Sequence, residues 1–207
     1  MKIKCFSLGS YSTNLYIASF GTDAYIIDAP EGIEPALEYV EESRLKVKAI
    51  LLTHGHFDHI LGLGKALEAL GDVPVYLAKE DHELVADGAV KLISMLKDFD
   101  PYFYASNQEA FDALPSEYLD YESFSGPFAI IKTPGHTKGS VSIKMDDVLF
   151  SGDTLFQCGM GRTDLGGDFR ELVKSLRALF TLDPSTYVLP GHGPGTTIGA
   201  EKSRGLV

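Results

Sequence analysis

The chain has 207 residues, of which 44% are hydrophobic, and its formal net charge at pH 7 is −11. This length suits one large or two small domains, and because there is no composition break, linker or repeat we expect a single domain over residues 1–207. A surface this acidic repels phosphate backbones, so the charge disfavours a nucleic-acid partner.

Neither a membrane nor an oxidising compartment is indicated by the sequence. No apolar run is long enough to span a bilayer, and the first ten residues lack the continuous apolar core of a signal peptide. The two cysteines, Cys5 and Cys158, have no metal-binding spacing. We therefore expect a cytoplasmic protein without a membrane partner, and the sequence leaves the oligomeric state open.

The first half of the chain is predicted to begin with strands and to continue with helices. Gly and Ser turns separate the first three strands. Strands are predicted over residues 2–8, 13–20, 23–28, 47–53 and 73–77. Helices are predicted over residues 34–42, through the apolar positions from 60 to 70, and over 81–97, before a segment rich in aromatic residues.

The second half repeats this pattern. Strands are predicted over residues 128–132, 140–145, 148–150 and 187–189, and a helix over 168–180. Asp168 can cap that helix, and Glu171 occupies the capping-box position. In each half of the chain, strands come first and helices follow. This order is typical of two sheets packed face to face with helices outside.

The run His54-Gly55-His56-Phe57-Asp58-His59 is the strongest chemical signal, and it directly follows an apolar strand. Imidazole and carboxylate together suit zinc or iron. Four such side chains within six residues cannot all reach one ion from a regular strand or helix, but from a loop they can diverge toward two ions. The alternative, a polar loop of hydrogen-bonded histidines, is disfavoured by the rest of the chain.

Three further candidate ligands each follow a predicted strand and an adjacent glycine. They are His136, Asp153 and His192. Strand ends gathered at one edge of a sandwich converge on one cleft, and a neighbouring glycine lets the backbone approach closely. We therefore expect these side chains to meet the first cluster, which accounts for five of the six histidines.

On these motifs, together with Gly161-Arg162-Thr163-Asp164, the chain resembles the metallo-β-lactamase superfamily over nearly its whole length. It most resembles the short, single-domain relatives of glyoxalase II, the hydroxyacylglutathione hydrolases. The resemblance implies an α+β fold with four layers, an αββα sandwich.

The resemblance also implies two divalent metal ions per chain, with zinc expected first and iron or manganese as alternatives. It assigns His54, His56 and His136 to one ion. It assigns Asp58, His59 and His192 to the other. Asp153 would bridge the two ions together with a water or hydroxide.

The expected chemistry is hydrolysis of thioesters such as S-D-lactoylglutathione or related 2-hydroxyacyl thioesters. A bound metal can lower the pKa of its water from about 15.7 to about 7, which supplies a bridging hydroxide to attack a carbonyl carbon. The metals would also stabilise the oxyanion, and a thiolate leaves without a strong general acid. Asp58, which would orient the hydroxide, and Asp153 are the candidate catalytic residues.

The sequence offers three candidate residues for recognition of the small-molecule substrate. Only 15 residues follow His192, so we expect no C-terminal domain of the kind that grips glutathione in full-length glyoxalase II. Tyr102 and Tyr104 could line a substrate groove or pack as core, and Arg162 could meet substrate or pair with a carboxylate.

Other functions stay open at this point. An iron-dependent persulfide dioxygenase would use one iron and oxygen on the same fold. Lactonases and phosphodiesterases of this fold are further options. A metal-stabilised interaction module would have an occluded cleft and no turnover.

Overall fold

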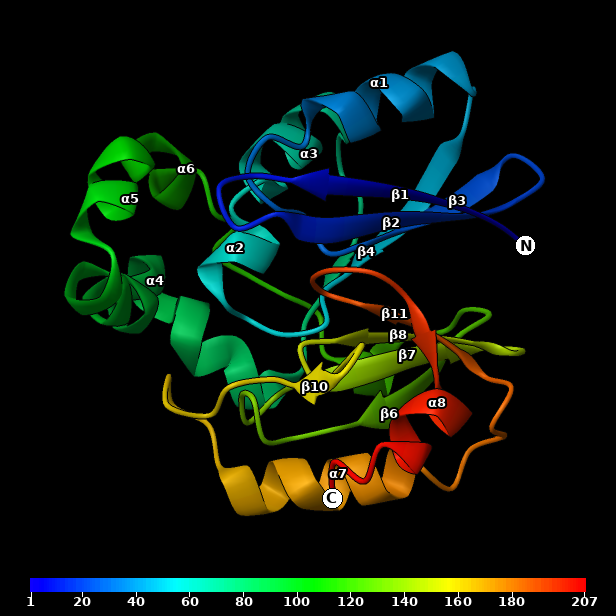
Figure 1. Ribbon diagram of the computed structural model, residues 1–207. Coiled ribbons are helices and arrows are strands. Elements are labelled where there is room, and N and C mark those ends of the chain that lie inside the picture. Colours follow the sequence, from blue (N-terminus) through cyan, green and yellow to red (C-terminus); the bar gives the residue numbers. More distant parts are fainter.

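The computed structural model describes the backbone of residues 1–207 and all side chains except those of Asp87 and Gly88. Two five-stranded sheets pack face to face, and helices cover the outer face of each sheet, as Figure 1 shows. The predicted four-layer αββα sandwich of the α+β class is therefore confirmed.

The first sheet has the strand order β1-β2-β3-β4-β5. Its strands are β1 (Lys2–Leu8), β2 (Thr13–Phe20), β3 (Asp23–Ile27), β4 (Lys46–Leu51) and β5 (Val75–Tyr76). The first three strands are antiparallel, whereas β3, β4 and β5 run parallel. Helices α1 (Glu34–Glu42) and α3 (Leu63–Leu70) lie over its outer face in Figure 1.

The second sheet has the order β12-β11-β8-β7-β6. Its strands are β6 (Ala129–Lys132), β7 (Val141–Met145), β8 (Val148–Gly152), β11 (Tyr187–Pro190) and β12 (Thr196–Thr197). β7 is antiparallel to both β6 and β8, and β11 is parallel to β8. Strands β6, β8 and β11 therefore run in one direction, so their carboxyl ends meet at the same edge.

Three hydrophobic clusters fill the spaces between the four layers. On β2, Leu15 and Ile17 pack toward the helices, whereas Tyr16 and Ala18 pack between the sheets. Because successive strand residues point to opposite faces, a strand buried on both faces has an almost continuous apolar sequence. The third cluster joins the second sheet to α7 (Phe169–Leu179), which lies beside α8 (Ile198–Ser203).

The middle of the chain forms helices that flank the sandwich at the left of Figure 1. They are α4 (Lys79–Phe99), α5 (Pro101–Ser106) and α6 (Gln108–Asp112), with a short 3₁₀ turn, η1, at Tyr121–Ser123. A residue before proline is disfavoured in the helical region, and Asp100 is extended, with φ −147°, so α4 ends there. The Asp100 side chain then accepts a hydrogen bond from Phe103 N and begins α5.

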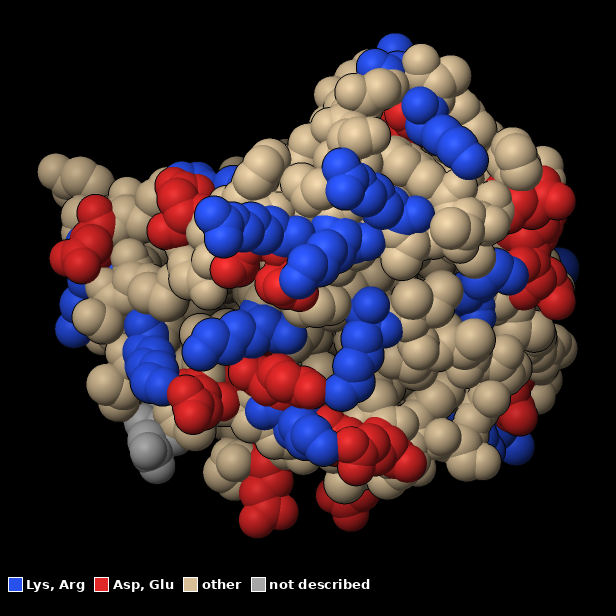
Figure 2. All heavy atoms as spheres, turned by 90° about the horizontal axis from the view of Figure 1, so that it is seen from below, with Lys and Arg blue, Asp and Glu red and all other residues tan. Residues whose placement is uncertain are grey.

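Three short elements near the ligand-bearing strand ends were not predicted separately from the sequence. They are α2 (Phe57–Ile60), β9 (Leu155–Phe156) and β10 (Gly159–Met160). Among the helices that the structure describes, none combines the length and apolar character needed to cross a bilayer. Figure 2 shows the face beneath α7, where Lys and Arg side chains are interspersed with Asp and Glu; on α7 itself Lys174 pairs with Glu171 at 2.6 Å.

Candidate metal centre

The seven candidate ligands come together at the edge where the strands end. His54 and His56 lie between β4 and α2, Asp58 and His59 lie on α2, and the others follow β6, β8 and β11. Their ligand atoms form three groups within each of which all atoms lie within 4.8 Å of one another. The groups are His54, His56 and His136; His54, His59 and Asp153; and Asp58, His59 and His192.

Asp153 lies between the two outer groups. Its Oδ2 is 3.5 Å from His136 Nε2 on one side and 3.5 Å from His192 Nε2 on the other. Its Oδ1 is 3.4 Å from His59 Nε2. A single carboxylate thus reaches histidines of both groups, the position that a bridging ligand requires.

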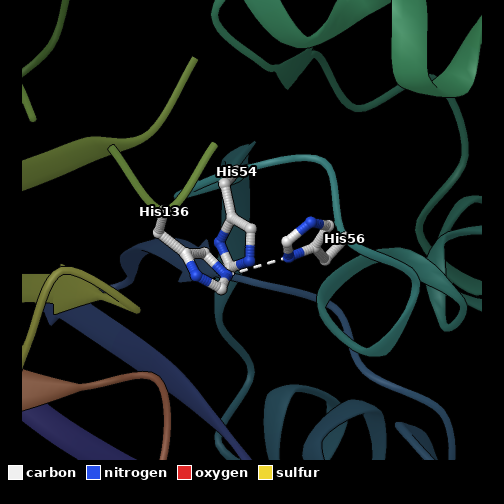
Figure 3. Close-up of side chains that lie close together, drawn as sticks. All are labelled: His54, His56 and His136. Carbon is white, nitrogen blue, oxygen red and sulfur yellow. Dashed lines mark hydrogen bonds between the residues drawn. The ribbon is translucent and has the colours of Figure 1, made fainter. Parts of the chain in front are cut away.

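The three histidines of the first group point toward one another from two separate loops, as Figure 3 shows. His56 Nδ1 lies 2.8 Å from His136 Nε2. All three side chains are at most 4% exposed, whereas the side chain of His192 is 29% exposed. Access from solvent is therefore on the side of the second group.

Hydrogen bonds at Nδ1 fix the orientation of four of the histidines. His136 Nδ1 donates to the Arg162 carbonyl at 2.7 Å, and His192 Nδ1 donates to the Tyr11 carbonyl at 3.1 Å. His59 Nδ1 donates to Asp28 Oδ2 at 2.8 Å. A histidine whose Nδ1 carries the donated proton keeps the Nε2 lone pair free for a metal.

His54 is oriented through a hydroxyl group. The Thr53 hydroxyl donates to Asp28 Oδ2 at 2.9 Å, so it accepts from His54 Nδ1 at 3.1 Å. Asp28 therefore supports both His54 and His59, the two histidines shared among the groups.

The donor atoms that face the cluster fit a metal ion. His54 Nε2, His59 Nε2 and Asp153 Oδ1 are buried and have no hydrogen-bond partner among the described residues. Buried polar atoms without partners are costly. Imidazole and carboxylate donors are the set that zinc and iron prefer, so a cation would satisfy the Nε2 atoms of His54 and His59 and the Asp153 oxygen.

The protonation states of His54, His56 and Asp153 also fit. Burial lowers the pKa of His54 well below its usual value and that of His56 to about 3, which keeps both rings neutral at pH 7. Burial opposes ionisation of Asp153, but the charge of His59 and a hydrogen bond from His192 hold its pKa well below the usual range. Metal binding requires neutral imidazole and ionised carboxylate. Burial opposes ionisation of His59 and His192, but the nearby carboxylates of Asp58 and Asp153 raise the pKa of both rings, to about 10 for His192, so these two must lose a proton when a metal binds.

Two buried aspartates support the site and were missed in the sequence. Asp28 follows β3 directly, as Asp153 follows β8, so its place at a strand end was a usable signal. Asp81 gave none, because it lies in a charged run at the start of α4, yet it is 0% exposed. Its carboxylate accepts hydrogen bonds from Gly55 N, Gly139 N and the Thr137 hydroxyl at 2.6 to 2.9 Å. Asp81 thereby joins the loop of His54 and His56 to the loop of His136.

Two of the glycines beside candidate ligands are required by close approach. Gly152 has φ +50°, and a Cβ there would lie 2.6 Å from side-chain atoms of Thr53, which follows β4 of the other sheet. A Cβ on Gly191 would lie 2.2 Å from Asp153 Oδ1 and 2.8 Å from His59 Cε1. Any larger residue at these positions would push the ligand-bearing strand ends apart.

The three residues expected from the sequence to meet substrate have other contacts. Tyr102 is 85% exposed, and Tyr104 packs against Phe111 beneath Lys97. The Arg162 guanidinium pairs with Asp164 at 2.6 Å. The main-chain carbonyl of Arg162, not its side chain, contacts the cluster, and a substrate role for these side chains stays a prediction.

Comparison with known proteins shows the family to which this sequence is similar. The family model of the metallo-β-lactamase superfamily matches residues 8–192. The probable metallo-hydrolase YqgX of Bacillus subtilis is 37% identical, over 99% of this chain and 96% of that protein. The hydroxyacylglutathione hydrolase GloC of Haemophilus influenzae is 35% identical, over 87% of this chain and 84% of that protein.

Solved structures are similar over almost the whole chain. The B3 metallo-β-lactamase BLEG-1 has a TM-score of 0.83 at 32% identity and covers 98% of this chain and 97% of its own. TTHA1623, in a di-iron-bound form, has a TM-score of 0.78 at 34% identity and covers 96% of each chain.

Proposed function

Because the chain belongs to the metallo-β-lactamase superfamily, we propose that it is a metal-dependent hydrolase of thioesters, with 2-hydroxyacyl thioesters such as S-D-lactoylglutathione as the substrate class. The similarity to the hydroxyacylglutathione hydrolase GloC supports this substrate class. In the reaction, water adds to the carbonyl carbon, the carbon–sulfur bond breaks, and a carboxylic acid and a thiol are released.

In this proposal His54, His56 and His136 would hold the first ion, and Asp58, His59 and His192 would hold the second. Asp153 would contact both ions, because its carboxylate lies near histidines of both groups. The di-iron form of the similar TTHA1623 supports a two-ion centre. When bound, two divalent ions supply Lewis acidity, which lowers the pKa of water and stabilises negative charge on oxygen.

Asp58 is the proposed positioning group for the attacking water. Its Oδ2 accepts a hydrogen bond from the Thr13 hydroxyl at 3.0 Å and lies 3.2 Å from His192 Nε2. This pair of contacts restricts the carboxylate on the side where the centre meets solvent. Asp58 Oδ2 is therefore placed to accept a hydrogen bond from water and to direct it toward a carbonyl carbon.

The observation that carries the proposal is the shared orientation of the histidines. Protein oxygens accept from Nδ1 of His54, His59, His136 and His192, which turns each Nε2 toward one small volume next to Asp153. In an ordinary polar loop, hydrogen bonds at Nδ1 would not turn the Nε2 atoms of all the histidines toward the same volume.

A hydrolysis screen of thioesters, lactones and phosphodiesters tests the proposal, with metal content measured on the same preparations. We expect thioesters to be turned over with the highest kcat/KM and activity to follow metal content. Faster turnover of a lactone or phosphodiester would contradict the thioester assignment. Oxygen uptake with glutathione persulfide, without thioester hydrolysis, would replace it by a persulfide dioxygenase.

A further inference from the structure

The loop that carries His192 is the most open part of the candidate metal centre. The His192 side chain is 29% exposed, compared with 13% for Asp58 and 11% for Asp153. The next residue, Gly193, has φ +73°, and a Cβ there would meet no described atom within 4 Å. Because little packs against this loop from outside, the position of His192 depends on hydrogen bonds from the body of the protein.

One side chain of the first sheet bonds this loop on both sides of His192. Asn14 Nδ2 donates to the Pro190 carbonyl at 3.0 Å and to the Gly193 carbonyl at 2.8 Å. Carbonyl oxygens only accept, so the group between them is the amide nitrogen, and both of its N–H donors are used. The main-chain N–H of Asn14 also donates to the Gly191 carbonyl at 2.7 Å. A single residue therefore holds three of the four carbonyls of residues 190–193.

The position of Asn14 explains how it reaches the second sheet. It is 4% exposed and lies at the start of β2, on the same strand face as Tyr16 and Ala18, which pack between the two sheets. The Tyr16 hydroxyl donates to the Pro190 carbonyl as well, at 2.7 Å. A buried amide is costly unless it is hydrogen-bonded, and the bonds of this amide go to the loop of His192.

The residues just before Asn14 contact the ligands directly. The Tyr11 carbonyl accepts from His192 Nδ1, and the Thr13 hydroxyl donates to Asp58 Oδ2 at 3.0 Å. Thr13 also forms an isolated antiparallel bridge with His192. Among the hydrogen bonds of the described residues, none joins residues 11–14 to a histidine of the first group. This segment therefore supports the second group alone.

We propose that Asn14 is a positioning residue that sets the affinity of the protein for the second ion; this inference rests on the two-ion centre of the proposed function. Asn14 keeps the loop in the conformation that places His192 Nε2 3.2 Å from Asp58 Oδ2. Without it, metal binding would have to order the loop, at a cost in conformational entropy. The first ion is unaffected, because Asp81 joins the loops of its ligands.

Stepwise titration of the metal-free protein with Co²⁺ tests this role. Co²⁺ binds the same nitrogen and oxygen donors, and its d–d absorption reports each ion as it binds. Asn14→Leu keeps the branched shape of the side chain, removes both donors and adds no charge. We expect two equivalents to bind to the wild type. In Asn14→Leu the affinity for the second should fall about 10- to 100-fold, while the affinity and the spectrum of the first stay unchanged.

Asn107→Leu is the matched control. Asn107 Nδ2 also donates to a main-chain carbonyl, that of Phe103 at 3.0 Å, but Asn107 lies between α5 and α6 and bonds to no loop of the centre. Both Co²⁺ affinities should stay at their wild-type values in this variant. Asn14→Ala, which also lacks the donors, provides the same comparison with a smaller side chain if Asn14→Leu does not fold.

The titration distinguishes two ways of failing. A single bound equivalent in the wild type would overturn the two-ion centre, and the role of Asn14 with it. If the wild type binds two equivalents but the Asn14 variants bind both with wild-type affinity, or lose both equally, only the role of Asn14 is overturned.

Discussion

Asp81→Asn is the most informative single substitution, because Asp81 joins the two loops that carry the first histidine group. The carboxylate accepts from Gly55 N at 2.9 Å, from the Thr137 hydroxyl at 2.7 Å and from Gly139 N at 2.6 Å. Asparagine has nearly the same shape, but its amide nitrogen would face a donor. The substitution therefore loosens the loops without opening a cavity.

The size of the effect follows from these three bonds. A hydrogen bond to a charged group contributes about 1.5–3 kcal/mol, so the gross interaction is at least about 4.5 kcal/mol. Burial raises the pKa of Asp81, which means that desolvation of the carboxylate offsets part of this sum. We expect a net loss of about 2–3 kcal/mol in the unfolding free energy of the metal-free protein.

The effect on metal binding should be confined to one ion. Loss of an outer partner typically weakens metal affinity about 10- to 100-fold, and we expect that loss for the ion of His54, His56 and His136. The ion of the second group should be retained within about 3-fold, because Asp28 supports His59 independently. Competition with a chromophoric chelator measures both affinities, and urea unfolding measures the stability of the metal-free protein.

Glu201→Gln provides the control for general destabilisation. Glu201 is also 0% exposed, and it accepts from the Thr196 hydroxyl at 2.6 Å and from Cys158 N at 2.9 Å. The Glu201→Gln substitution should lower the unfolding free energy of the protein while the affinities for both metal ions stay unchanged. If Asp81→Asn left both ions bound with wild-type affinity, or weakened both equally, the assigned role of Asp81 would be wrong.

Three further predictions concern turnover. Asp58→Ala should lower kcat by at least about 100-fold, a typical scale for losing a group that positions a reacting atom; near-wild-type activity at unchanged metal loading would refute its role. Thr13→Val removes the hydroxyl that donates to Asp58 and should lower kcat about 3- to 10-fold, with thermal unfolding as the check on fold. Because the net charge is −11, a glutathione thioester should show a higher KM than its neutral N-acetylcysteamine analogue, and the gap should narrow as salt screens the charges; a gap that is independent of salt would exclude this electrostatic cause.

Much of the fold could be predicted because its strongest signals are local. The buried strands were visible as apolar runs, and Leu172, Leu176 and Leu179 on α7 have the spacing of one buried helix face. The side chains that gather at the centre were also visible, because each follows an apolar strand. Parallel directions of β6, β8 and β11 then bring those strand ends to one edge.

The supporting residues could not be predicted in the same way. Burial of Asp81 depends on two glycine-containing loops that lie 26 and 58 residues away along the chain, and its neighbours in the sequence are those of an exposed helix start. An aromatic segment has the same composition whether it packs in the core or lines a substrate groove. The sequence therefore predicted substrate contact for the aromatic segment from Tyr102 to Tyr104. In the structure Phe103 is buried and Tyr104 packs on Phe111.

Anomalous scattering from crystals of metal-saturated protein tests the two-ion centre most directly. We predict two peaks about 3.5 Å apart, one in contact with His54, His56 and His136, the other with Asp58, His59 and His192, and Asp153 in contact with both. A single peak at full occupancy, after purification with ample metal, would contradict the two-ion centre.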